Sequence, residues 1–335
     1  MATVKQSFSF DDYRHSGKQE FYSFLKTNIN HRAKNIRHLA VSSVAPSKER
    51  TALAENIACQ LAREGNRVLF ISTDLTYKSE LASKGGLTHL LAQLLGRPVS
   101  KGQILDYGLL DLFFLVYLQQ RTGTLELLTR NNNKYTATFR QGIVCRLETP
   151  NYKMSDIDAN LKMKKASWKE LARTYNQELQ HLFQEFKRVS FVSFAFYQSM
   201  VLGLKKVPKL LGDTYPFIHE QLEGHNYILR CLHLNSFKRE HNFFIMNRGT
   251  HALNLAKGKS YQSVSSLLEL LSRHYDRIVV DTPTLCQGQD GALLCGLSEG
   301  ALIVIDHHNV SRFRINRAVH KLKDADVNIV GTVLG

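Results

Sequence analysis

Residues 38–71 read HLAVSSVAPSKERTALAENIACQLAREGNRVLFI, and the fold follows from the pattern of this stretch. A short apolar run at 38–42 precedes an Ala-rich amphipathic segment at 51–64, which Gly65 closes, and a β-rich run follows at 67–71. Strand, loop, helix and strand in this order are typical of a parallel sheet with right-handed crossovers. We therefore expect an α/β domain around these residues.

The same alternation returns in the C-terminal third of the chain. Apolar periodicity predicts strands over 227–234, 243–246, 277–281, 301–306 and 328–334, and helices over 264–274 and 312–323. We expect one α/β domain split by an insertion, with its N-terminal half at 1–96, the insertion at 97–224 and its C-terminal half at 225–335. The predicted fold class is α/β, a mainly parallel sheet with helices on both faces.

The insertion has a different pattern from the two halves. Helical spacing predicts a helix over 109–120, and alternation predicts short strands over 123–129, 134–140 and 143–148 with turns at 131–133 and 141–142. Residues 155–222 are expected to be helical, around a long helix for which Ser167 and Glu170 form a capping box. The insertion is therefore predicted to be an α+β module.

The loop between the first strand and the first helix lies where a phosphate-binding loop would lie. Such a loop needs glycines that turn N–H groups toward the phosphates, a Lys for the β/γ oxygens and a Ser or Thr hydroxyl for Mg²⁺. Residues 42–51 contain no glycine, Arg50 stands at the Lys position, and Thr51 still supplies a hydroxyl. Glu49 adds a carboxylate where a phosphate would sit, which is unfavourable.

The wider pattern resembles the kinase domain of the bacterial tyrosine kinases that govern capsule and exopolysaccharide chain length, within the ParA–MinD superfamily. The resemblance covers roughly 20–96 and 240–335. Seven segments carry it in order: EFYSFLKTNI at 20–29, LAVSSVAP at 39–46, AENIA at 54–58, VLFISTDL at 68–75, GLTHL at 86–90, YDRIVVDTP at 275–283 and NIVGTVL at 328–334. The resemblance implies a P-loop fold and a role in polysaccharide synthesis.

The departures from this family concern the catalytic positions. Ser47 and Glu49 replace family glycines, Arg50 replaces the Walker lysine, and Ser72 replaces the first aspartate of the second acidic motif. Each loss removes several kcal/mol from an electrostatically organised phosphoryl-transfer site. We therefore expect a pseudo-enzyme without a cofactor. The open alternative is an active ATPase or autokinase that binds ATP or ADP with Mg²⁺ through an unorthodox loop.

The candidate site residues follow from this resemblance. Ser47, Lys48, Arg50 and Thr51 form the degenerate phosphate loop, and Thr51 with Asp281 would hold Mg²⁺ if it binds. Asp74, the second aspartate of the second acidic motif, and Asp281, the Walker B aspartate, are the vestigial catalytic residues.

Part of the insertion resembles a second kind of module. Residues 106–150 are similar to a PATAN-type module, through LLDLFFL at 109–115, RTGTLEL at 121–127 and ATFRQGIV at 137–144. This resemblance implies protein–protein interaction rather than catalysis. An ordinary β-hairpin decoration remains the alternative interpretation.

Composition limits the class of protein and its partners. The chain has 335 residues, a formal net charge of +15 and five scattered cysteines without CxxC spacing, so neither a disulfide framework nor a zinc site is predicted. No apolar run is long enough for a membrane span, and the polar start is unlike a secretory signal. We expect a cytoplasmic protein peripheral to the inner membrane. Its basic charge favours an acidic partner or an anionic membrane surface.

The expected function combines these observations. The chain is predicted to be a scaffold or regulatory subunit of a bacterial exopolysaccharide or cellulose-type synthesis and secretion machine. Protein partners in that machine are expected, and a homo-oligomer stays open. Nucleic acid is not expected, because no base-reading motif is present.

Overall fold

The computed structural model describes residues 7–9, 36–73, 85–96, 99–104, 106–154, 168–198, 226–249, 255, 258–306 and 310–334. The chain forms two compact units, Met1–Leu91 with Leu232–Gly335, and Ala92–Cys231. The segment 20–29, which contributed to the family resemblance, lies outside the described residues. Among the described helices, none has both the length and the apolar character needed to cross a bilayer.

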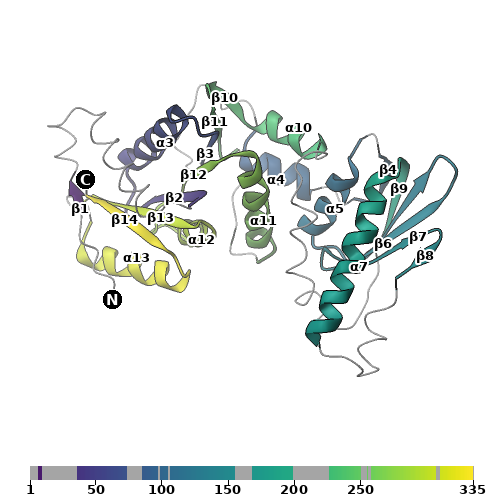
Figure 1. The fold of residues 1–335 in the computed structure, drawn as a ribbon. Coiled ribbons are helices and arrows are strands. Elements are labelled where there is room, and N and C mark those ends of the chain that lie inside the picture. The colour runs from purple at the N-terminus through teal and green to yellow at the C-terminus, as the bar shows by residue number, and fades with distance from the viewer. Residues whose placement is uncertain are drawn as a thin grey trace. The chain divides into compact units, whose positions relative to one another are not determined.

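The first unit is built on an eight-stranded sheet with the order β1-β14-β13-β2-β12-β3-β11-β10 (Figure 1). All neighbouring strands are parallel except β10 and β11. The strands are β1 (Ser7–Ser9), β2 (His38–Ser43), β3 (Val68–Ser72), β10 (Phe237–Glu240), β11 (Phe243–Met246), β12 (Arg277–Asp281), β13 (Gly300–Ile305) and β14 (Ile329–Leu334). After the insertion the chain therefore returns to the same sheet, where β12 pairs directly with β2.

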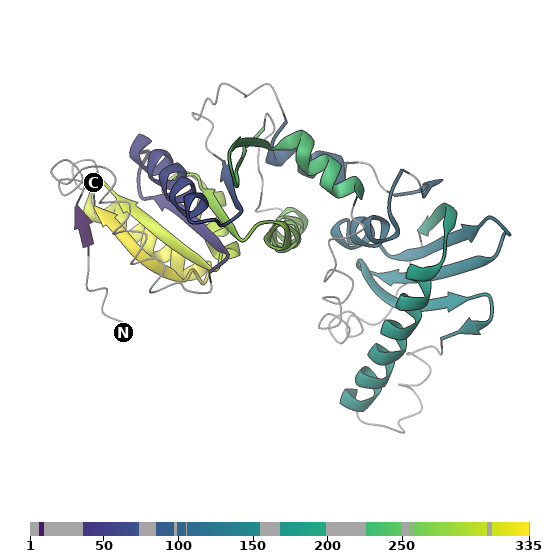
Figure 2. The same cartoon turned by 45° about the horizontal axis from the view of Figure 1, so that its top comes forward.

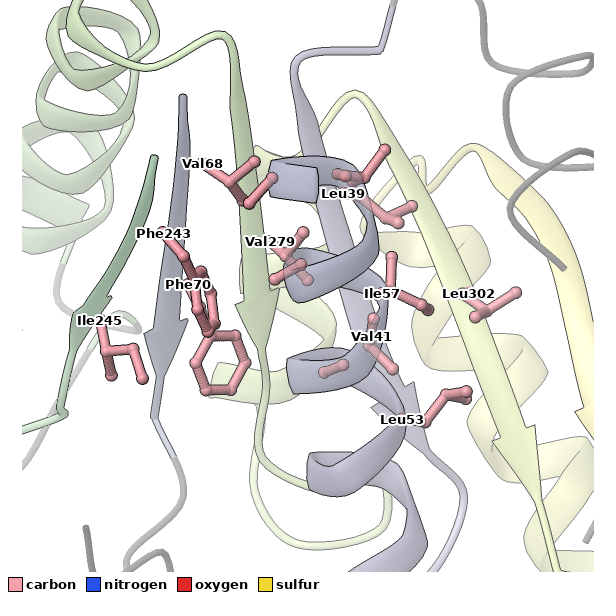
Figure 3. Close-up of a cluster of buried hydrophobic side chains, with 14 of the residues drawn as sticks. Leu39, Val41, Leu53, Ile57, Val68, Phe70, Phe243, Ile245, Val279 and Leu302 are labelled. Atoms are coloured by element: carbon pink, nitrogen blue, oxygen red, sulfur yellow. The ribbon is translucent and has the colours of Figure 1, made fainter. Parts of the chain in front are cut away.

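Helices cover both faces of this sheet, so the predicted α/β fold is confirmed (Figures 1 and 2). The helix α3 (Lys48–Arg63) packs on the face that carries Leu39 and Val41, where Leu53 and Ile57 join the same buried cluster (Figure 3). The opposite face, which carries Ala40 and Ala301, packs against α12 (Asp290–Leu297) and α13 (Arg312–Asp324). Alternation along each strand therefore supplies two apolar layers.

The second unit contains a six-stranded antiparallel sheet with the order β4-β9-β5-β6-β7-β8. Its strands are β4 (Lys101–Gln103), β5 (Gly123–Thr129), β6 (Lys134–Arg140), β7 (Ile143–Thr149), β8 (Tyr152–Lys153) and β9 (Phe191–Gln198). Two helices, α5 (Leu109–Leu118) and α7 (Trp168–Arg188), supply Phe113 and Phe183 to its core, where Phe113 contacts Phe139 of β6. The short strands, the turns and the first helix of the insertion agree with the sequence pattern.

One element differs in type from its prediction. Residues 227–234 were expected to be a strand, but they lie in the helix α10 (Asn226–Asn235). The buried side chains Ile228, Cys231 and Leu232 follow helical spacing. In so short an apolar run, helix and strand are not distinguished by the sequence pattern. The carboxylate of Asp111, far away in sequence, accepts hydrogen bonds from the N–H groups of Tyr227 and Ile228 and caps the helix.

A second difference lies in the segment 155–222, which was expected to be helical. The helix α7 occupies part of it, but β9 follows as a strand between β4 and β5. Phe191, Phe194 and Phe196 are buried while Val192 and Tyr197 are exposed, so the strand buries one aromatic face. Its backbone pairing with β5 stabilises the extended conformation, so the helical prediction was wrong for these residues. Residues 155–167 and 199–225 lie outside the described part of the chain, as does the predicted cap at Ser167.

The remaining helices are α4 (Leu87–Leu95) and α11 (Gly258–His274). The chain leaves the first unit within α4 and returns to it within α10, because the unit boundaries fall after Leu91 and after Cys231.

Candidate functional site: a closed polar cluster at the end of the parallel strands

The candidate site lies where β2 runs into α3, at the carboxyl ends of the central strands. In an open parallel sheet this edge is where ligands bind. Ser47 is the N-cap of α3 with extended backbone angles (φ −144°, ψ 127°), and its Oγ accepts a hydrogen bond from the Arg50 N–H. The Ser47 hydroxyl also donates to Glu49 Oε2 at 2.8 Å. The loop is therefore closed as an ordinary helix cap.

The backbone of this loop does not have the geometry of a phosphate cradle. Residues 42–51 are all described, and none of them has a positive φ. Without such angles the successive N–H groups do not turn toward a common point, as they do in an anion-binding nest. Glu49 meanwhile places its carboxylate in the first turn of α3, where the helix N-terminus would otherwise attract an anion.

Arg50 points inward and is buried, with only 1% of its surface exposed. Its Nε lies 2.6 Å from Oδ1 of Asp281, which is fully buried at the end of β12. Its remaining nitrogens reach neighbouring hydroxyls, with Nη1 3.4 Å from Ser43 Oγ and Nη2 3.3 Å from Thr51 Oγ1. The guanidinium is therefore held on several sides by the end of β2, the start of α3 and β12.

The second carboxylate oxygen of Asp281 is also engaged. Thr51 Oγ1 donates to Asp281 Oδ2 at 2.8 Å, and Ser72 Oγ donates to the same oxygen at 3.3 Å. The main-chain carbonyl of Asp281 accepts from both the hydroxyl and the N–H of Thr73, at 2.6 and 3.0 Å. The carboxylate therefore has a cationic partner and two hydroxyl donors within the protein.

The Arg50–Asp281 pair is neutral, because one buried cation faces one buried anion. A buried ion pair tolerates removal from water only when its geometry is good and the other hydrogen-bonding groups are satisfied. Both conditions hold for the Arg50 Nε and for both oxygens of Asp281. Among the described side chains, the positive charge of Arg50 is therefore matched by Asp281 rather than left open to the phosphates of a nucleotide.

The arrangement does not fit the nucleotide and Mg²⁺ that a P-loop would hold. Mg²⁺ needs near-octahedral oxygen ligands at about 2.0–2.1 Å. Thr51 and Asp281 are brought together, as the motif requires, but the Arg50 guanidinium sits on Asp281 Oδ1. A dication at this point would lie beside a fixed positive charge.

The predicted site residues divide into two groups. Ser47, Arg50, Thr51 and Asp281 lie together at the end of the strands. Lys48 begins α3, and its side chain is outside the described part of the structure, as is the whole of Asp74.

Sequence reasoning missed the contribution of three hydroxyl residues, Ser43, Ser72 and Thr73. Ser72 was interpreted only as a lost carboxylate, yet it pairs in register with Asp281 across β3 and β12 and donates to it. Ser43, at the end of β2, lies beside the Arg50 guanidinium, and Thr73, directly after β3, donates to the main-chain carbonyl of Asp281. Polar residues at the ends of adjacent parallel strands were the available signal, because these ends meet at one edge of the sheet.

The fold and the position of this loop define the class as an α/β protein with a P-loop NTPase-like fold. Solved structures similar to this chain include the kinase domain of the Escherichia coli tyrosine kinase ETK, at 15% identity and a TM-score of 0.43, covering 94% of this chain and 74% of that chain. The kinase domain of VpsO matches at 15% identity and a TM-score of 0.46, covering 97% and 98%. The chimerical protein CapA2B2 matches at 10% identity and a TM-score of 0.46, covering 99% and 93%. At these TM-scores the likeness carries no statement about activity.

The two other comparisons give no relatives. No protein-family model matches the chain, and no curated protein matches it.

Proposed function

We propose that this chain is a catalytically degenerate member of the bacterial tyrosine kinase class. In this proposal it works in the cytoplasm, beside the membrane, as a scaffold or regulatory subunit of an exopolysaccharide or cellulose-type synthesis and secretion machine. The buried Arg50–Asp281 ion pair is the observation that carries the proposal. The polysaccharide context rests on the seven sequence segments that resemble the kinase family.

The ion pair supports a non-catalytic role because it engages both Arg50 and Asp281, the two charged groups that nucleotide chemistry would need. The cation at the Walker lysine position is turned into the protein, and the Walker B aspartate is satisfied by Arg50, Thr51 and Ser72. An active P-loop protein changes conformation when γ-phosphate and Mg²⁺ bind and leave. In this chain Arg50 supplies a permanent cation at Asp281 and holds this end of the sheet in one conformation. A fixed conformation suits a scaffold.

Nucleotide binding is the first experimental test. A ligand that binds only the folded state raises the thermal midpoint of unfolding. Because we expect no nucleotide binding, millimolar Mg-ATP or Mg-ADP should leave this midpoint unchanged. We also expect no phosphate release above background. Turnover of ~1 s⁻¹, the lower end of typical enzymes, that disappears in Asp281→Asn would overturn the proposal and favour the ATPase alternative.

Polymer production in the native host is the second test. Deleting the gene should reduce secreted polysaccharide, and Thr51→Ala should restore it fully. This variant keeps the Arg50–Asp281 pair but removes the hydroxyl that Mg²⁺ would require. A folded Thr51→Ala protein that fails to restore polymer would show that the hydroxyl has a catalytic use. Unchanged polymer in the deletion strain would remove the polysaccharide role.

A further inference from the structure

The helix α13 has one buried face and one solvent face. Ala318 and Leu322 are buried in the cluster that lies against β13, and Ile315 packs beside them. This fixes the orientation of the helix along the outside of the sheet, on the face opposite α3 (Figures 1 and 2). The residues pointing away from this cluster are therefore presented to solvent.

A large aromatic side chain stands on that solvent face. Phe313 is 75% exposed, the highest value among the large hydrophobic residues that the structure describes. Helical spacing puts Phe313, Arg317 and His320 on one line, because residues three, four and seven apart share a face. An exposed fraction this high leaves most of the ring in water, which is unfavourable unless a partner covers it.

Exposed cationic side chains also lie along α13. Arg312, Arg314, Arg317 and Lys323 are all exposed, and within the described part of the chain none of them forms an ion pair. We call these four residues, with Phe313, the α13 basic face. The only acidic residue in the helix is Asp324, at its end.

Lys321 does not belong to this face. Its Nζ donates to the main-chain carbonyls of Leu285 and Gly288, at 2.7 and 2.6 Å, and so fastens α13 to the loop that follows β12. The lysine therefore stabilises the first unit and gives the helix a fixed base.

We propose that the α13 basic face docks on an anionic lipid surface. Arginine and lysine are attracted to acidic headgroups, and an aromatic side chain gains by entering the boundary between headgroups and acyl chains. The net charge of +15 adds a long-range attraction of the same sign.

A membrane fits this face better than nucleic acid does. A helix that reads DNA enters the major groove, whereas α13 is packed along its length against the sheet through Ala318 and Leu322. A flat anionic surface can meet all four cations and the ring together. Lipid binding is measured without nucleotide, so its failure would leave the proposed loss of catalysis untouched.

Co-sedimentation with vesicles tests the proposal on the full chain. We expect binding to vesicles of phosphatidylcholine with phosphatidylglycerol, no binding to pure phosphatidylcholine, and loss of binding at high salt. Arg312→Glu/Arg317→Glu should weaken binding at least about tenfold, since each basic residue near an anionic surface contributes roughly fivefold in affinity and two are reversed. Phe313→Ser should weaken binding without changing its salt dependence.

Matched variants elsewhere in the chain complete the test. Arg130→Glu/Arg188→Glu changes the net charge by the same amount at two exposed arginines of the second unit, and Leu234→Ser removes a 66% exposed leucine of α10. We expect both to bind vesicles like the unaltered chain. Equal losses in the control and α13 charge variants would overturn the assignment to α13. Binding to a DNA or RNA oligonucleotide that needs Phe313, without vesicle binding, would overturn the lipid assignment.

Discussion

Arg50 and Asp281 form a buried ion pair, with Nε 2.6 Å from Oδ1, although 231 positions separate them in the sequence. The pair joins the first turn of α3 to the end of β12, and therefore joins the two segments on either side of the insertion. Its energetic role can be measured directly.

Replacing Arg50 by Met should lower the free energy of unfolding by about 3–5 kcal/mol, because Asp281 would keep a buried charge without its cation. Arg50→Met/Asp281→Asn should recover part of this loss, since the uncompensated charge is then absent. Urea denaturation measures both. Arg63→Met, at an exposed position of the same helix, is the control and should change stability by less than about 0.5 kcal/mol. Equal effects of Arg50→Met and Arg63→Met would show that the pair contributes nothing.

The buried carboxylate of Asp111 should stabilise the second unit. It accepts from the N–H of Gly108 at the start of α5 and from those of Tyr227 and Ile228 at the start of α10. Asp111→Ala leaves these donors without an acceptor, and we expect a loss of about 2–4 kcal/mol in the free energy of unfolding. Faster amide hydrogen exchange at Tyr227 and Ile228 would show that the start of α10 is affected. Unchanged exchange there would contradict the capping role.

His274 should make stability depend on pH. Burial, together with Arg67 and His233, lowers the pKa of His274 from 6.5 to about 4. Arg67 Nη2 lies 2.7 Å from His274 Nε2, which is consistent with a neutral ring that accepts a hydrogen bond. Because the unfolded chain takes up this proton at higher pH, stability should fall as the pH drops from about 6.5 to about 4.

Two histidine variants test this pH dependence. His274→Gln keeps an acceptor without a titrating ring, so the fall in stability over this range should be smaller than in the unaltered chain. His181→Gln replaces an exposed histidine of α7 and serves as the control. An identical pH profile for His274→Gln and the unaltered chain would assign the effect to other groups.

The turn between β6 and β7 should tolerate no side chain at its second residue. Gln141 and Gly142 have φ values of 49° and 82°, as in a type I′ turn, and a Cβ on Gly142 would lie 2.6 Å from the carbonyl oxygen of Tyr117. Gly142→Ala should therefore destabilise by about 1–3 kcal/mol more than Gly65→Ala. Gly65 also has a positive φ, 93°, but a Cβ added there would meet no atom within 4 Å. Equal thermal midpoints for the two variants would show that the backbone of Tyr117 moves aside.

Local patterns predicted much of this fold because each depends on near neighbours. The alternating side chains of β5, β6 and β7 and the turn at Gln141 and Gly142 are properties of short segments, and these predictions are confirmed. The apolar run at 227–234 was misinterpreted because strand and helix are both compatible with so short a run. The helix there depends on Asp111, which the chain brings to it from the opposite end of the insertion.

The order of residues was enough to predict the α/β class, the return to one sheet after the insertion, and a loop at 42–51 that lacks glycine. The role of Arg50, in contrast, became visible only in the folded chain. A surface arginine in that loop could have met a phosphate from solution, but the strand order places β12 between β2 and β3 and so sets Asp281 under the start of α3. Which buried charges meet depends on the pairing of strands that are far apart in the chain. A local sequence pattern does not specify which of these strands become neighbours.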